Sequence, residues 1–522
     1  MSKPISFGIF DFKIVASMDD TRTKPETETP FRICIMGDFS GRANRGVVDR
    51  LSTLKNLRPI EVDRDNIEDV MAKMGVEVRL SAAGKDNAPV TIRFTELDDM
   101  HPNNIFERVE VFKTLRDIRK RLNDPRTFES AKKEVQTWAG VRPTEPSSTI
   151  SAQSGHKPVT PPGDSGSILD QIIGQTDGRP PDKDAVMKSS GWDAFLQQIV
   201  GPNLVSSDDP EQEKLVAAVD ASISTLMQAI LHNPDFQTVE AAWRALRFLV
   251  YRVETDERLK VYILDMSKAE LEDDLNRTED LSSTLAYKLF VEQAVGTLGG
   301  EPWAVLAGNY TFDQTLEDAR ILGRMARIAS LAGAPFISAA HPHTLGCASL
   351  ADIPDPTEWK ISSDPEDARA WNAVRKLPES CYIGLALPRF LLRLPYGADT
   401  DPVDYFEFGE MPQPPIHENY LWGNPSFACA LLLAQAFTNY GWDLRPGAIL
   451  DIEGLPLHVY KYKGESEIKP CAEVLLTEKA VERILELGLM PLISYKNKDN
   501  IRLARFQSVA DPLTQLAGPW DS

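Results

Sequence analysis

The stretch LKVYILDMSKAELEDDLN at 259–276 joins an apolar, strand-like run (259–265) to a helical run (267–276). The same succession recurs downstream. Strand-like runs are found at 303–309, 334–338, 382–387 and 455–461, and helical runs at 283–297, 315–332, 365–376, 426–440 and 476–487. Strands that alternate with helices are typical of an α/β core. We therefore predict an α/β (α+β) fold for this part of the chain.

Two longer helices are predicted immediately upstream, at about 210–232 and 237–252. Apolar residues recur in both at helical spacing, and Trp243 lies on the apolar stripe of the second helix. The dipeptide Asn233-Pro234 separates the two runs. Because proline ends a helical pattern, the pair is expected to form a helical hairpin.

The N-terminal part predicts a second α/β unit. Its first strand is ISFGIFDFKIV at 5–15, in which the apolar alternation slips by one residue. Further strands are expected at 31–36, 76–80 and 90–94, and a helix at about 103–122. The run GDFSG at 37–41 predicts a tight turn that glycine permits, since no Gly-Lys-Ser/Thr follows to form a phosphate-binding loop.

The composition between these two units predicts a flexible linker. Seventeen of the 27 residues at 140–166 are Pro, Gly, Ser or Thr, and such a segment buries too little apolar surface to fold. We therefore predict a domain at 1–139, a linker at 140–166 and a larger domain at 167–522, with room for the two domains to dock side by side. A short amphipathic run follows the linker and contains Ile168, Leu169, Ile172 and Ile173.

The charge and cysteine content exclude several classes of partner. The chain has 522 residues and a formal net charge of -20, which disfavours binding to nucleic acid or to anionic membranes. No long apolar segment predicts a signal peptide or membrane insertion. The five cysteines are widely spaced and form no CxxC motif, as expected for reduced thiols. These features predict a cytoplasmic protein.

The search for chemistry-bearing residues indicates no catalytic, cofactor or metal site. His341, His343 and Cys347 are close in sequence, but Pro342 prevents a shared helical face and no further ligands are evident. A metal-dependent cytosolic hydrolase that uses these three residues is the alternative from another functional class.

Two arginines, Arg389 and Arg393, lie in the apolar run PRFLLRLPY at 388–396. Because buried or interfacial arginines need partners, they predict ion pairs. Carboxylates in the following segment, within the domain or from a neighbour, are the expected partners: Asp404, Glu407 or Glu410.

A family resemblance covers most of the chain. The segment at about 5–125 resembles the small (TssB/VipA/ImpB) subunit of the type VI secretion contractile sheath, on GDFSG (37–41), DRDN (63–66) and LDDMHP (97–102). The segment at about 165–509 resembles the large (TssC/VipB/ImpC) subunit. Its landmarks include LHNPDFQTVEAAWRALRFLV (231–250), YIGLALPRFLLRLPYG (382–397), YLWGN (420–424) and GLMPLISYKNKDN (488–500).

The resemblance implies a mechanical rather than an enzymatic role. It implies that the two units dock as an intramolecular heterodimer, that other sheath subunits, an Hcp-type inner tube and baseplate proteins are partners, and that extended arms knit neighbours together by strand addition. It also implies a helix for a Clp-family AAA+ ATPase, here Ile168, Leu169, Ile172 and Ile173. The candidate interface residues are Phe7, Ile9, Phe12, Ile14, Trp243, Arg389 and Arg393.

Three departures from the family pattern leave an alternative open. The two subunits are fused, the large-subunit resemblance ends short of the family's C-terminal segment, and the flanks of 167–173 are rich in Pro and Gly. A sheath lacking interlocking strands could depend on other chains. The alternative within the family is therefore a non-polymerising accessory that caps, initiates or adapts a sheath.

Overall fold

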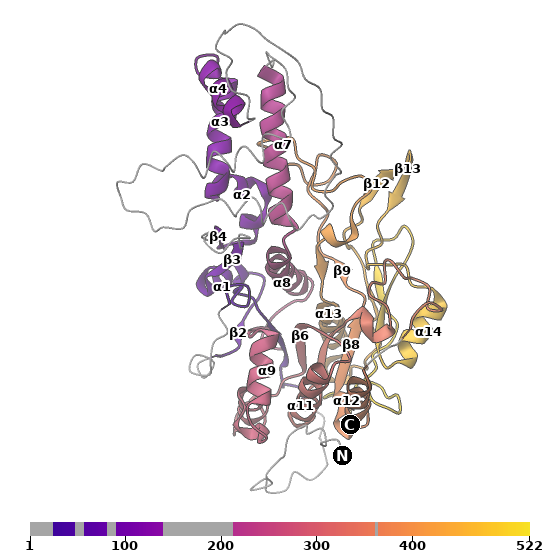
Figure 1. Ribbon diagram of the computed structural model, residues 1–522. Coiled ribbons are helices and arrows are strands. Elements are labelled where there is room, and N and C mark those ends of the chain that lie inside the picture. Colours follow the sequence, from indigo (N-terminus) through magenta and orange to yellow (C-terminus); the bar gives the residue numbers. More distant parts are fainter. Residues whose placement is uncertain (1–24, 47–56, 81–89, 139–211, 361–363, 522) are drawn as a thin grey trace.

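The computed structural model describes residues 25–46, 57–80, 90–138, 212–360 and 364–521. The predicted strand at 5–15, the linker at 140–166 and the amphipathic run at 168–173 lie outside these ranges. We call residues 25–138 of the described chain the N-terminal part and residues 212–521 the C-terminal part. The predicted α/β fold is confirmed (Figure 1).

A nine-stranded sheet forms the centre of the described molecule, in the order β11-β15-β14-β8-β7-β6-β1-β5-β2. The strands from β14 to β5 run parallel to one another, and antiparallel pairs lie at the two ends of the sheet. The bounds are β1 Phe31–Gly37, β2 Ile60–Glu61, β5 Leu259–Asp265, β6 Val305–Phe312, β7 Phe336–Ala340, β8 Ile383–Leu387, β11 Asp451–Ile452, β14 Met490–Ser494 and β15 Ile501–Leu503.

The sheet combines strands from both parts of the chain. All seven residues of β1 pair with β5, and its other edge pairs with β6 from Ile33 to Met36. A parallel strand between two neighbours satisfies its backbone groups on both sides. The N-terminal part is therefore built into the central sheet of the C-terminal part.

Helices cover both faces of the sheet. Ile33 and Ile35 of β1 belong to the apolar cluster that contains α8 and α13, whereas Cys34 and Met36 belong to the cluster of α9 and α11. This division follows from the two-residue period of a strand. The helices are α1 Ile67–Met74, α2 Pro102–Arg108, α3 Lys113–Asn123, α4 Phe128–Trp138, α7 Gln212–Leu231, α8 Pro234–Val250, α9 Lys268–Asn276, α10 Leu285–Tyr287, α11 Leu316–Ala332, α12 Pro365–Arg375, α13 Pro425–Tyr440 and α14 Glu478–Glu486.

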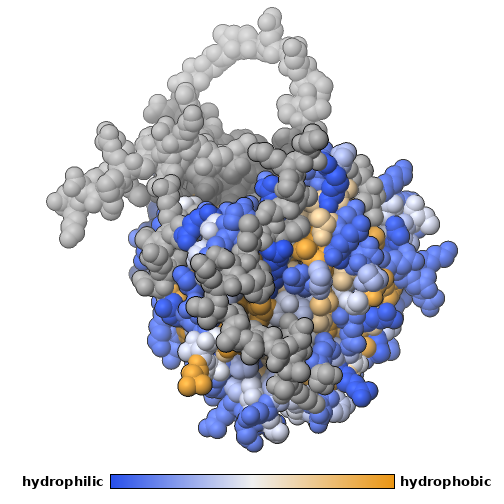
Figure 2. Space-filling view, turned by 90° about the horizontal axis from the view of Figure 1, so that it is seen from below, coloured by the Kyte–Doolittle hydropathy of each residue, from blue (hydrophilic) through white to orange (hydrophobic). Residues whose placement is uncertain are grey.

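Within the described ranges, three smaller strand pairs lie outside the main sheet, and all three are antiparallel. They are β3 Val76–Leu80 with β4 Val90–Phe94, β9 Phe390–Leu391 with β10 Trp422–Gly423, and β12 Val459–Tyr462 with β13 Glu465–Ile468. Seen from below the view of Figure 1, the described surface is mostly hydrophilic, with apolar patches between the hydrophilic residues (Figure 2).

A helical arm extends from the sheet at the top of Figure 1, where α3 and α4 lie beside α7. Among the described residues, α7 is the one helix long and apolar enough to cross a membrane by length and composition. Half of its most apolar window is buried in the protein, and it packs on α3, α4 and α8. Its apolar stripe is therefore used by the core of the arm.

The predicted helix at 103–122 is wrong as a single element. It is divided into α2 and α3, because Val109 is extended (φ -82°, ψ 125°) and a short 3-10 turn follows it. The break lets Phe106 pack against Phe112 with ring centroids 5.6 Å apart. Both pieces still bury the same apolar stripe, so the hydrophobic period alone does not reveal the break.

Candidate functional site: the contact between the two parts and the carboxyl edge of the sheet

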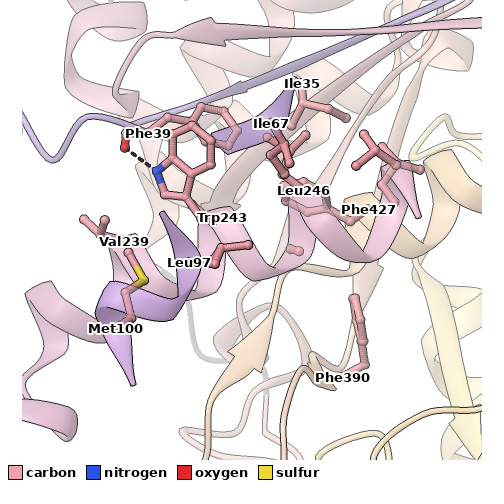
Figure 3. Packing of buried hydrophobic residues seen from close by; sticks show 14 of the residues in the cluster. Ile35, Phe39, Ile67, Leu97, Met100, Val239, Trp243, Leu246, Phe390 and Phe427 are labelled. Carbon is pink, nitrogen blue, oxygen red and sulfur yellow. Dashed lines mark hydrogen bonds between the residues drawn. The ribbon is translucent and has the colours of Figure 1, made fainter. Parts of the chain in front are cut away.

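Trp243 links the two parts of the chain. Helix α8 begins at Pro234 because Asn233 caps it, its side chain accepting the backbone N–H groups of Asp235 and Phe236. Two and a half turns later Trp243 is fully buried, and its Nε1 donates to the carbonyl of Phe39 at 2.7 Å. The rings of Trp243 and Phe39 meet edge to face, with their centroids 5.7 Å apart (Figure 3). Trp243, which the sequence predicts as an interface residue, therefore makes its contact within the chain, between the C-terminal and N-terminal parts.

The GDFSG turn is held by the C-terminal part. Asp265 Oδ1, at the end of β5, accepts the backbone N–H groups of Phe39 and Ser40 at 2.8 and 3.1 Å. Gly41 has φ +75°, and a Cβ atom there would lie 2.4 Å from the carbonyl oxygen of Glu77. Both facts require glycine at this position. The turn is thus a tight structural connection, as the sequence predicted.

Polar contacts continue along the same boundary. Arg119 of α3 forms a two-pronged ion pair with Asp220 of α7, with Nη2 to Oδ2 at 3.1 Å. Asn103 exchanges two hydrogen bonds with Asp404: its amide donates to the carboxylate at 2.9 Å, and its Oδ1 accepts the Asp404 N–H at 3.0 Å. Paired donors and acceptors of this kind fix the register of the two parts.

A buried ionic network joins α8 to the segment that follows β9. Arg393 is 9% exposed and donates to Glu240 at 2.8 Å and to Glu410 at 2.7 and 3.0 Å. Arg244 donates to Glu240 at 2.7 Å and to the Tyr396 hydroxyl at 2.8 Å. Glu240 and Glu410 are fully buried, so two positive and two negative charges balance one another in the interior.

The charges of this network are stabilised by their partners. Burial opposes the charge of Glu240, but the charges of Arg393 and Arg244 outweigh it and lower the pKa of that carboxyl. Of the three carboxylates predicted for the two arginines, Glu410 pairs with Arg393. Asp404 instead bonds Asn103, and the backbone carbonyl of Glu407 accepts from Ser224.

Arg389 lies at the carboxyl edge of the sheet, two residues after β8. Its side chain donates to Glu473 Oε1 at 2.8 Å and its backbone N–H to Oε2 at 2.9 Å. Burial opposes the charge of Glu473, but hydrogen bonds from His417 and Arg389 outweigh it and lower the pKa of the carboxyl to about 2. The Arg389 side chain stays 42% exposed, so it also reaches the surface.

Replacing Glu473 with Gln is expected to reduce the acid sensitivity of the protein. The pKa of Glu473 is lower in the folded chain than the ordinary value of about 4.3. Its contribution to stability is therefore complete above that value and is lost as the pH falls toward about 2. Urea-unfolding midpoints measured from about pH 6 down to about pH 3 should fall less steeply for Glu473→Gln than for wild type.

The matched control for this experiment is Glu486→Gln, because Glu486 forms an exposed pair with Arg483. Its pH profile should follow that of wild type. Identical acid slopes for Glu473→Gln and wild type would show that the Arg389–Glu473 pair does not couple folding to pH.

The histidine pair also lies at the carboxyl edge, but without Cys347. The side chains that come together are Asp313, His341 and His343, whose donor atoms lie within 4.8 Å of one another. Cys347 is buried, its Sγ lies 3.6 Å from the carbonyl oxygen of Pro342, and burial raises the pKa of its thiol to about 11. Cys347 is thus not part of the group of ligand atoms that the described residues bring together here.

A cavity of about 330 Å³ adjoins this cluster. Its lining includes Thr311, His341 and Leu387 at the ends of β6, β7 and β8, together with Arg389, Glu418 and Glu473. Open α/β sheets place ligand crevices outside the carboxyl ends of their strands. The position of this cavity follows that rule.

Each of the two parts of the chain matches a known protein family. Residues 213–510 match the family described as VipB: EvpB/VC_A0108, tail sheath N-terminal domain. Residues 13–137 match the family described as type VI secretion system, VipA, VC_A0107 or Hcp2. A type VI secretion system sheath protein TssC1 from Pseudomonas aeruginosa is 37% identical over 318 residues, which cover 59% of this chain and 64% of that protein. The chain thus spans less than two thirds of that relative's length.

Proposed function

The chain belongs to the VipB tail sheath family over residues 213–510, and on this premise we propose that it is a structural component of a type VI secretion contractile sheath. A VipA-type unit, matched at 13–137, and the VipB-type unit act as one molecule. The observation that carries the proposal is the position of β1 between β5 and β6. A unit that shares its central sheet moves as one rigid body when neighbouring copies repack.

The partners follow from this role. The chain would assemble with other sheath subunits around an Hcp-type inner tube and meet baseplate proteins at the end of the sheath, in the cytoplasm. A Clp-family AAA+ ATPase would recognise the run at 168–173. The chemistry of assembly is strand addition and surface complementarity, without a catalytic step. The tight internal pairing of the buried arginines and glutamates supports a structural rather than an enzymatic use of these groups.

The candidate interface residues divide between internal and external contacts. Trp243 and Arg393 are buried and act within the chain. Arg389 is the one of the three with a substantially exposed side chain, at 42%. We therefore assign contacts between copies to Arg389 and, from the sequence alone, to Phe7, Ile9, Phe12 and Ile14.

Negative-stain electron microscopy tests the proposal. The purified chain is imaged alone, with an Hcp-type tube protein, and with a separate VipA–VipB-type sheath pair. Tubular assemblies formed by the chain, alone or on the inner tube, are the expected result. Discrete particles that change the length of tubes formed by the separate pair would indicate a capping or initiating accessory. Particles that leave tube formation unchanged and do not bind the tubes would overturn the proposed role.

A further inference from the structure

Two neighbouring strands bring Asp313 and His341 together. Asp313 directly follows β6, and His341 directly follows β7. The strands are parallel neighbours, and Phe312 pairs with Ala340 at their ends. The His341 N–H donates to the carbonyl of Phe312 at 2.8 Å. The sheet therefore sets the spacing of these two side chains, independently of any surface loop.

A tight turn after β7 brings a third side chain, that of His343, to the first two. His343 lies in the 3-10 turn Pro342–Leu345, which returns its ring to within 4.1 Å of the His341 ring, centroid to centroid. Its Nδ1 is 3.0 Å from Asp313 Oδ2, and Nδ1 of His341 is 3.9 Å from the same oxygen. Although Pro342 prevents a helical arrangement of the two histidines, the turn brings them onto one carboxylate.

We propose that Asp313, His341 and His343 bind one divalent transition-metal ion of the zinc, cobalt or nickel type. Imidazole nitrogens favour these ions over magnesium or calcium, and a carboxylate completes a set of three protein ligands. In tetrahedral zinc sites, bonds of about 2.0–2.1 Å place the donor atoms about 3.3 Å apart. Donor atoms within 4.8 Å of one another reach that spacing by rotation of the side chains.

The existing hydrogen bonds of the two histidines determine how tightly we expect the metal ion to bind. Nδ1 of His341 accepts the backbone N–H of His343 at 3.2 Å, and Nδ1 of His343 lies at hydrogen-bond distance from Asp313. An ion at this site replaces both interactions, so its affinity is micromolar rather than that of a structural zinc centre. The neighbouring Asp318 is already used, since it accepts the Asp313 N–H and pairs with Lys268.

The arrangement leaves room for solvent ligands. The His343 side chain is 55% exposed and that of Asp313 25%, and His341 also lines the cavity at the carboxyl edge. Three protein ligands and one or more waters complete the coordination. Bound metal would join the segment after β6 to the turn after β7 beside this cavity. The inference concerns these side chains alone and is independent of the proposed sheath role.

Titration of the full chain with Co²⁺ tests the site, using protein prepared without a polyhistidine tag. Ligand-field bands in the visible region are expected, with one ion per chain and micromolar Kd. A thiolate charge-transfer band in the near ultraviolet should be absent. Zn²⁺ should displace Co²⁺ and abolish the visible bands.

Two ligand variants test the assignment, one at the exposed His343 and one at the partly exposed Asp313. His343→Ala and Asp313→Asn are expected to weaken binding about tenfold or more, as measured by calorimetry. The controls are His101→Gln, on the boundary of α2, and Cys347→Ala, which should bind Co²⁺ as wild type does. Far-ultraviolet circular dichroism checks that every variant is folded.

Three outcomes would overturn the site. They are the absence of Co²⁺ and Zn²⁺ binding at about a hundred times the expected Kd, unchanged affinity in both ligand variants, and loss of binding in Cys347→Ala. The last two would place the ion elsewhere in the molecule.

Discussion

Replacing Arg393 with Met is expected to lower the free energy of unfolding by about 3–5 kcal/mol. Arg393 is nearly buried between Glu240 and Glu410. The substitution keeps most of the apolar stem and removes the charge, so it leaves two buried carboxylates without their shared cation. The desolvation cost of those carboxylates then falls on the folded state alone.

The two carboxylates are not left equally well paired when Arg393 is replaced. Glu240 keeps its ion pair with Arg244. Among the described contacts, Glu410 keeps the Tyr396 N–H at 2.7 Å and has His232 at 3.8 Å. Glu410 is therefore the more poorly compensated charge. A second substitution, Glu410→Gln, should recover about 1 kcal/mol or more of the loss caused by Arg393→Met, which is a coupling typical of directly paired groups.

Urea unfolding followed by tryptophan fluorescence measures both effects. The matched control is Arg483→Met, which removes an exposed pair with Glu486 and should change stability by less than about 1 kcal/mol. If Arg393→Met and Arg483→Met are equally mild, the buried network is not a major source of stability. If the double variant is as unstable as the sum of its parts, Arg393 and Glu410 are not coupled.

Local elements could be predicted from the sequence because their signals are local. The strand at 259–265 and the helix at 267–276 correspond to β5 and α9. The break at Asn233-Pro234 lies where α7 and α8 meet, because Asn233 caps α8. Capping, proline and hydrophobic period act over a few residues. They specify an element without specifying its neighbours.

The order of strands in the sheet could not be predicted in this way. Strand β1 lies between β5 and β6, more than 200 residues away in the chain. An apolar strand such as FRICIM suits any buried position in a parallel sheet. Its place is decided by the helices on both faces, which pack Ile33 on one side and Cys34 on the other. That information is distributed over the whole fold.

In the candidate site, the positively charged residues were easier to predict from the sequence than the negatively charged residues that pair with them. Arg389 and Arg393 stand out in an apolar run, but Glu240, Glu473 and Asp313 were not singled out. For Glu240 a signal was present, since it lies four residues after Phe236 and three before Trp243, on the buried stripe of α8. A carboxylate on an apolar stripe predicts a buried partner. Asp313 has no such signal, because it reaches the two histidines only through the pairing of β6 with β7 and the turn after β7.

Replacing Trp243 with Ala is expected to lower the free energy of unfolding by about 3–5 kcal/mol and to weaken the contact between the two parts. The indole is fully buried, packs on Phe39 and donates to its carbonyl. Alanine leaves a cavity and an unpaired carbonyl. Trp243→Phe keeps most of the volume and removes the donor, so its cost should be about 1–3 kcal/mol, that of an unsatisfied buried acceptor.

The contact itself can be measured after the chain is cut. A protease site placed within the predicted linker at 140–166 yields two fragments, which should co-elute in the wild-type background because β1 pairs on both edges with strands of the other fragment. A loss of about 3–5 kcal/mol from Trp243→Ala corresponds to a dissociation constant raised about a hundredfold to several-thousandfold. The fragments should then separate at micromolar concentration.

Tyr251→Ala provides the control at the end of the same helix, because Tyr251 is 46% exposed. Its effect should stay within about 1 kcal/mol, and its fragments should remain together. If the Trp243→Ala fragments co-elute and have the same dissociation constant as the wild-type fragments, the binding energy lies in the sheet pairing of β1 alone. Separation of the wild-type fragments would contradict a molecule in which the VipA-type and VipB-type units act as one body, since the linker would then be what holds them together.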